Sequence, residues 1–91
     1  MAAIPQLTVL PKAIGLIAGN GLFPQLFARA AQARGVEVVA VAMRGETLEG
    51  IEGVVDHLTW VRVGQLGRTI KIFKQAGIRQ AAMAGGVRKT R

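Results

Sequence analysis

Glycine-rich turns are the parts of this chain whose residue types and spacing could do chemistry. The turn Gly19-Asn20-Gly21 directly follows the apolar residues 14–18 and precedes Phe23-Pro24. An apolar run that ends so abruptly is typical of a buried parallel strand that leads into a helix. Glycines at such a junction let backbone N–H groups come close to a phosphate at the helix N-terminus. The sequence therefore indicates a binding site for a phosphorylated ligand.

Two later turns are built in the same way. Gly64-Gln65-Leu66-Gly67 follows residues 57–63, and Gly85-Gly86-Val87-Arg88 follows residues 80–84, two segments that we interpret as strands. The carboxyl ends of parallel strands lie at one edge of a sheet, and α/β proteins bind their ligands there. We therefore expect the three turns, together with Arg88, to form one anion-binding edge.

A nicotinamide dinucleotide is an alternative ligand for this edge. The fingerprint G-x-G-x-x-G is met only at Gly19 and Gly21, because Pro24 stands where the third glycine belongs. The second expected strand ends in Arg44 instead of the acid that holds a ribose hydroxyl, and an arginine there suits the 2′-phosphate of NADP. A nucleotide- or NADP-binding module therefore stays open.

The chain offers no recognisable catalytic or metal-binding set. Glu46, Glu49 and Glu52 have a spacing that favours a solvated helical face over a metal site. Asp56 and His57 are neighbours in sequence and would point to opposite sides of a strand. The chain has no cysteine, which excludes thiolate ligands and a thiol nucleophile. We therefore expect no catalytic residue, no metal ligand and no cofactor within this chain.

The formal net charge of +7 predicts that the chain attracts anions. The aromatic residues Phe23, Phe27, Trp60 and Phe73 are expected in the core or at an interface. They do not alternate with basic residues as a base-stacking platform requires, so nucleic acid is not an expected partner. No apolar run approaches the roughly 20 residues that span a bilayer. We expect a soluble, cytoplasmic protein.

The expected elements repeat one pattern: a strand, a glycine turn, an amphipathic helix, a glycine cap and a strand. Strands are predicted at residues 13–18, 36–43, 57–63 and roughly 80–84, with one helix after Pro24 and another from Gly64. Gly35 and Gly77 are the expected helix ends. This repetition predicts an α/β fold, a Rossmann-like doubly wound parallel sheet of about four strands in the order 3-2-1-4. Residues 1–12 are expected to be an N-terminal tail.

The apolar stripes of the two helices should face the sheet. On the first helix we place Leu26 and Phe27 in that stripe, and on the second we place Ile70 and Phe73. The short acidic segment between residues 44 and 56 is predicted to be a crossover with a short helix.

Three motifs in order resemble a known family. They are residues 14–21 with Phe23-Pro24, then residues 60–67, then residues 83–87. Together they are similar to the amino-terminal domain of the LpxI family, the UDP-2,3-diacylglucosamine pyrophosphatases of lipid A biosynthesis. The similarity covers about residues 13–91.

The resemblance implies a hydrolase that splits the pyrophosphate of UDP-2,3-diacylglucosamine into UMP and lipid X, with magnesium or another divalent cation. In the family a carboxy-terminal domain follows, holds the acidic residues expected to serve the metal, and forms the lipid-substrate cleft with the first domain. The resemblance thus implies that residues 13–91 are a substrate-binding domain, truncated before that second domain and inactive alone.

Under this hypothesis the glycine turns supply backbone donors and three side chains supply polar contacts. The expected substrate-binding residues are Gly19, Asn20, Gly21, Gly64, Gln65, Gly85, Gly86 and Arg88. The expected partners are a UDP-linked diacylated glucosamine or lipid X, the missing carboxy-terminal domain and a second copy of the chain. The location is expected to be cytoplasmic, including a peripheral position at the inner membrane.

Overall fold

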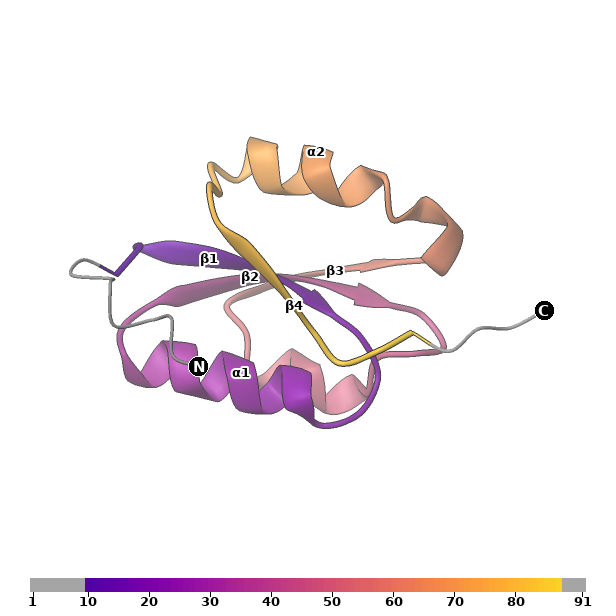
Figure 1. Cartoon of the computed structure of the whole chain (residues 1–91), viewed down its shortest axis with the longest axis horizontal. Coiled ribbons are helices and arrows are strands. Elements are labelled where there is room, and N and C mark those ends of the chain that lie inside the picture. The colour runs from indigo at the N-terminus through magenta and orange to yellow at the C-terminus, as the bar shows by residue number, and fades with distance from the viewer. Residues whose placement is uncertain (1–9, 88–91) are drawn as a thin grey trace.

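A four-stranded sheet between two helical layers forms the protein in the computed structural model, which describes residues 10–87 (Figure 1). The strands are β1 (Ala13–Ala18), β2 (Glu37–Met43), β3 (His57–Val61) and β4 (Ala81–Ala84). All pairs are parallel and the order is β3-β2-β1-β4. The predicted α/β fold and strand order are confirmed.

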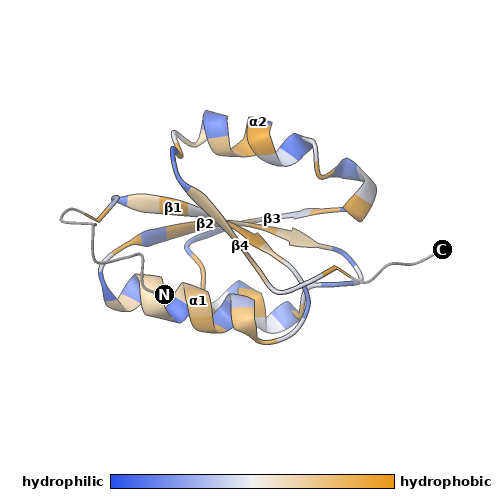
Figure 2. Cartoon of the chain, in the orientation of Figure 1, coloured by the Kyte–Doolittle hydropathy of each residue, from blue (hydrophilic) through white to orange (hydrophobic). Residues whose placement is uncertain are grey.

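β1 and β2 are the two inner strands of the sheet, and β1 pairs with β2 on one side and with β4 on the other. Ala18 at the carboxyl end of β1 is opposite Ala84, the last residue of β4, and Ala42 on β2, so these three strands end within one residue of one another. Figure 2 shows that the strands are mainly apolar, whereas the helices alternate apolar and polar residues. This pattern is the expected one for a parallel sheet covered on both faces.

The helices α1 (Phe23–Ala33) and α2 (Arg68–Gln75) cover opposite faces of the sheet (Figure 1). Two short 3₁₀ helices, η2 (Glu49–Gly53) and η3 (Val63–Gln65), lie in the connections before and after β3. The core on the α1 face consists of Leu16, Ala18, Ala28, Val38, Ala40, Ala42, Ile51, Val54 and Ala84. The core on the α2 face consists of Val39, Val41, Met43, Val61 and Phe73.

The α2 layer depends on one glycine in the central strand. A Cβ atom added to Gly15 would lie 2.8 Å from Cζ of Phe73, which is closer than real Cβ contacts come. The ring of Phe73 therefore packs directly on the backbone of β1. Because Phe73 is the large buried side chain of α2, this contact sets how closely the helix approaches the sheet.

The predicted orientation of both helices was wrong in one respect. Leu26 is 60% exposed and Ile70 is 66% exposed, although both were placed in the stripes that face the sheet. On α2 the buried residues are Thr69 and Phe73, which are four apart and share a face, and Ile70 is turned about 100° from Thr69. The predicted start at Gly64 was also wrong, since η3 precedes the helix and α2 begins at Arg68.

Within residues 10–87, neither α-helix has the length and apolar character that crossing a bilayer would require.

Candidate functional site

The turns that follow the four strands lie at one edge of the sheet, because all four strands are parallel. We call this edge the carboxyl rim and define it as residues 19–23, 44–47, 62–66 and 85–87. The prediction that the glycine turns share an edge agrees with this topology. Arg88, the remaining predicted contact, lies outside the described residues.

The turns after β1 and β4 are in direct backbone contact. The Gly19 N–H donates to the Ala84 carbonyl at 2.8 Å, and the Asn20 N–H donates to the Gly86 carbonyl at 2.7 Å. A Cβ atom on Gly19 would overlap the Gly86 carbonyl oxygen, and one on Gly85, whose φ is +86°, would overlap the Asn20 carbonyl oxygen. Gly19 and Gly85 are therefore required for the two turns to touch. The N–H groups of Gly19 and Asn20 already donate hydrogen bonds within the protein.

Asn20 braces the rim from within. Its Oδ1 atom accepts the Gly86 N–H at 3.1 Å, and its Nδ2 atom donates to Oε1 of Glu46 at 3.2 Å. One side chain thus connects the turns after β1, β2 and β4. The sequence indicated Asn20 as a ligand contact, and the structure places both ends of its amide in internal hydrogen bonds.

Thr47, which is not among the predicted site residues, is a second residue that connects these turns. Its buried hydroxyl donates to the Ala18 carbonyl at 2.6 Å and accepts the Met43 N–H at 2.8 Å. It therefore fixes the turn after β2 to the end of β1. Two features of the sequence could have indicated this residue: it is a polar residue four positions beyond the last residue of a buried strand, and it follows the acid Glu46.

Open backbone donors lie at the N-terminus of α1. Within residues 10–87, the N–H groups of Gly21, Leu22 and Phe23 donate no hydrogen bond, whereas those of Gln25 and Leu26 both donate to the Leu22 carbonyl. No side chain caps this helix end, since the side chain of Leu22 at the N-cap position has no hydrogen-bond acceptor. The helix dipole places partial positive charge here. Three unpaired N–H groups at such an end form a site suited to a phosphate.

The turn after β3 contributes differently. Oε1 of Gln65 accepts the Arg62 N–H at 3.1 Å, so part of the Gln65 amide supports the turn. Gly64 has a negative φ, and an added Cβ atom would meet nothing within 4 Å. Neither backbone conformation nor packing therefore requires a glycine there.

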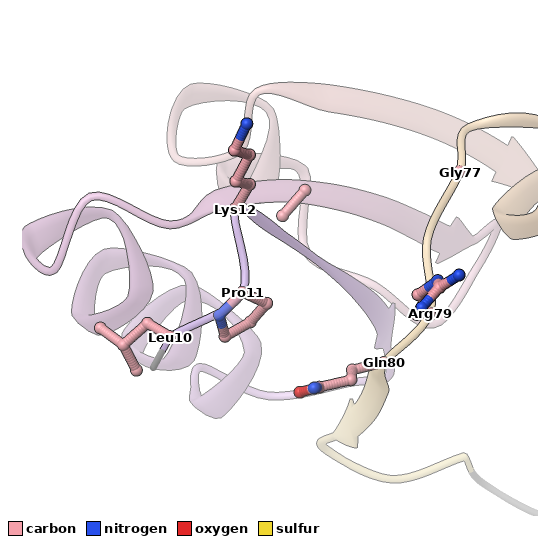
Figure 3. A pocket seen from close by; sticks show the side chains of 7 residues that line it. Leu10, Pro11, Lys12, Gly77, Arg79 and Gln80 are labelled. Carbon is pink, nitrogen blue, oxygen red and sulfur yellow. The ribbon is translucent and has the colours of Figure 1, made fainter. Parts of the chain in front are cut away.

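One hollow lies beside the carboxyl rim, and another lies at the opposite edge of the sheet. One of about 230 Å³ adjoins the rim and is lined by Arg44, Gly45, Thr47, Glu49, Glu52 and Trp60. The indole Nε1 of Trp60 donates to Oε2 of Glu52 at 3.3 Å across its wall. Another, of about 360 Å³, lies at the amino ends of β1 and β4 and is lined by Leu10, Pro11, Lys12, Ala13, Gly77, Arg79 and Gln80 (Figure 3). This second hollow is at the opposite edge and shares no residue with the rim.

The titratable pair at the start of β3 also belongs to the opposite edge. Oδ2 of Asp56 accepts the Val38 N–H at 2.7 Å and the Gln32 amide at 3.2 Å. These two hydrogen bonds, the backbone one first, lower the pKa of Asp56 below its ordinary value of 3.8. Nε2 of His57 lies 2.9 Å from Oε2 of Glu37 in an exposed pair. Asp56 and His57 thus bind different partners and form no catalytic pair.

Comparison with known proteins identifies the family. No match was found among curated proteins. A family model for the LpxI N-terminal domain matches residues 13–91, which is the whole chain except its first twelve residues. The match includes all four strands and every turn of the rim. The chain therefore belongs to the LpxI N-terminal domain family.

Proposed function

We propose that this chain binds the substrate of a UDP-2,3-diacylglucosamine pyrophosphatase and holds its phosphate groups at the carboxyl rim. The family suggests a role in lipid A precursor metabolism. The observation that carries the proposal is the uncapped N-terminus of α1, where the N–H groups of Gly21, Leu22 and Phe23 are unpaired among the described residues.

Phosphate oxygens would accept hydrogen bonds from these three N–H groups and gain from the positive end of the helix dipole. The glycine contact between the turns after β1 and β4 and the Asn20 amide keep the donors in place before the ligand arrives. Preorganised donors lose little entropy on binding. Gly64 leaves room for the ligand on the β3 side of the rim.

In this proposal the chemistry of pyrophosphate hydrolysis is supplied by a second, carboxy-terminal domain. That domain would provide the carboxylates for magnesium or another divalent cation, whose chemistry is to neutralise charge on the phosphates. Leu22, Phe23 and Val63 at the rim are 63%, 58% and 40% exposed, and apolar side chains gathered at one edge suit a partner surface. We propose that this partner is the second domain and that the chain is inactive without it.

Titration of the chain with lipid X, UMP, NADP and an RNA oligonucleotide, each at low and high salt, tests this function. We expect lipid X and UMP to bind and the oligonucleotide to bind only weakly. Binding of NADP without binding of lipid X or UMP would favour the alternative, a nucleotide-binding module, which the exposed Arg44 at the end of β2 supports. A steep salt dependence with the tightest binding to the oligonucleotide would contradict both.

A further inference from the structure

Charge is strongly segregated along this chain. All five acidic residues lie between positions 37 and 56, whereas residues 57–87 contain five arginines and lysines and no acid. The second group belongs to β3, α2, β4 and their connections. The helix α2 is the helical layer on its side of the sheet (Figure 1). The acid on this side is Glu37, at the amino end of β2, where it pairs with His57.

The basic residues of α2 share its outer face. Thr69 and Phe73 face the sheet, whereas Arg68, Lys71 and Lys74 are exposed. These three cations are spaced three residues apart, which places them side by side on one helix surface. Within residues 10–87, none of the three forms an ion pair or a side-chain hydrogen bond. Their charge is therefore available to a partner.

An isoleucine lies on the same face. Ile70 is 66% exposed and does not belong to either buried core. At a bilayer surface the cations of such a face can contact lipid headgroups while a neighbouring aliphatic side chain enters the acyl boundary. The larger apolar side chain of α2, Phe73, is buried against the sheet, so charge supplies most of the attraction. The exposed face has no aromatic side chain on which a nucleic-acid base could stack.

We propose that the outer face of α2, formed by Arg68, Ile70, Lys71 and Lys74, docks on the surface of an anionic lipid bilayer. Each cation held close to such a surface raises the partition coefficient about fivefold. With three cations and one aliphatic side chain the attachment is weak and reversible. The face points away from the sheet, so the open N–H groups of α1 stay accessible, and the inference stands independently of what those groups bind.

Co-sedimentation of the 91-residue chain with lipid vesicles tests the proposal. We expect binding to vesicles of phosphatidylethanolamine and phosphatidylglycerol, loss of binding at high salt, and no binding to pure phosphatidylcholine. The double variant Lys71→Gln/Lys74→Gln should lower the partition coefficient by about thirtyfold. The matched control Arg29→Gln/Arg34→Gln removes the same charge from one exposed position in α1 and one directly after it, and should change the partition coefficient by less than about threefold, because α1 covers the opposite face.

The aliphatic contact has its own matched pair. Ile70→Ser should weaken vesicle binding several-fold, whereas Leu26→Ser, at a position of similar exposure on α1, should leave it unchanged. Circular dichroism checks that every variant is folded. Equal losses from the two double variants, absence of binding to anionic vesicles, or tighter binding to an oligonucleotide than to vesicles at the same salt would each overturn the proposal.

Discussion

The uncapped end of α1 offers the sharpest test by substitution. In Leu22→Asp, a carboxylate would stand beside the three N–H groups that we assign to phosphate. Leu22 is 63% exposed, so its removal costs little packing. A negative charge at the N-terminus of a helix stabilises it by about 0.3–1 kcal/mol. We therefore expect the folded protein to be as stable as the wild type or slightly more stable.

The effect on ligand binding should have the opposite sign. Two unit charges 4 Å apart repel by about 4 kcal/mol near a protein surface, and side-chain movement reduces this value. A loss of about 2 kcal/mol corresponds to roughly a thirtyfold weaker affinity. The control is Leu26→Asp, which makes the same charge change at a residue that is 60% exposed one turn further along α1. There the ligand affinity should fall by less than about threefold.

Calorimetric titration with lipid X measures the affinities, and thermal unfolding followed by circular dichroism measures the stabilities. The expected result is a more stable or equally stable Leu22→Asp protein that has lost affinity, beside a Leu26→Asp protein that has kept it. If Leu22→Asp binds as tightly as the wild type, or if both variants lose affinity equally, the N-terminus of α1 is not the phosphate site.

Three further predictions concern the packing of α2, the glycine turns and Asp56. Gly15→Ala should destabilise the fold by about 1–3 kcal/mol, because its Cβ atom would lie 2.8 Å from the Phe73 ring, and adding Phe73→Leu should recover part of the loss in urea unfolding. Gly19→Ala should destabilise the fold, because its Cβ atom would overlap the Gly86 carbonyl oxygen. Gly64→Ala has open space around it, so it should change stability by less than about 0.5 kcal/mol while it weakens lipid X binding. Equal unfolding midpoints for the two variants would contradict this. The pKa of Asp56 is lowered in the folded state, so its hydrogen bonds stabilise the fold above pH 3.8, and this contribution is lost as the pH falls through the folded pKa. The difference in unfolding free energy between wild type and Asp56→Ala should therefore shrink in acid. A difference that stays constant with pH would refute the assignment.

Much of the fold could be predicted because its signals are local. The apolar runs of β1 and β2 and the glycine ends of both helices are visible in sequence, and Gly35 and Gly77 do have φ of +79° and +75°. These signals define two strand–helix–strand units, and such units favour a parallel sheet with right-handed crossovers. Right-handed crossovers are compatible with more than one order of a doubly wound sheet, so the order β3-β2-β1-β4 was one of the possible predictions, and the structure confirms it.

The remaining features depend on contacts between distant residues. Whether Ile70 faces the sheet depends on where α2 begins, and that is set by the η3 turn with its bond from the Arg62 N–H to Gln65. Asn20 bonds to residues that are 26 and 66 positions away along the chain. Thr47 bonds to Ala18, which is 29 positions away. Spacing within one segment cannot reveal such partners. The common edge of the turns could therefore be predicted, but the hydrogen bonds between the turns could not.

The central claim is that the carboxyl rim binds phosphate through the N-terminus of α1. Titration of the isotope-labelled chain with lipid X, followed by backbone amide NMR, tests it most directly. The account predicts that the largest saturable shifts occur at the N–H groups of Gly21, Leu22 and Phe23. Saturable shifts confined to the opposite edge, around Lys12 and Arg79, with the α1 N-terminus unchanged, would contradict it.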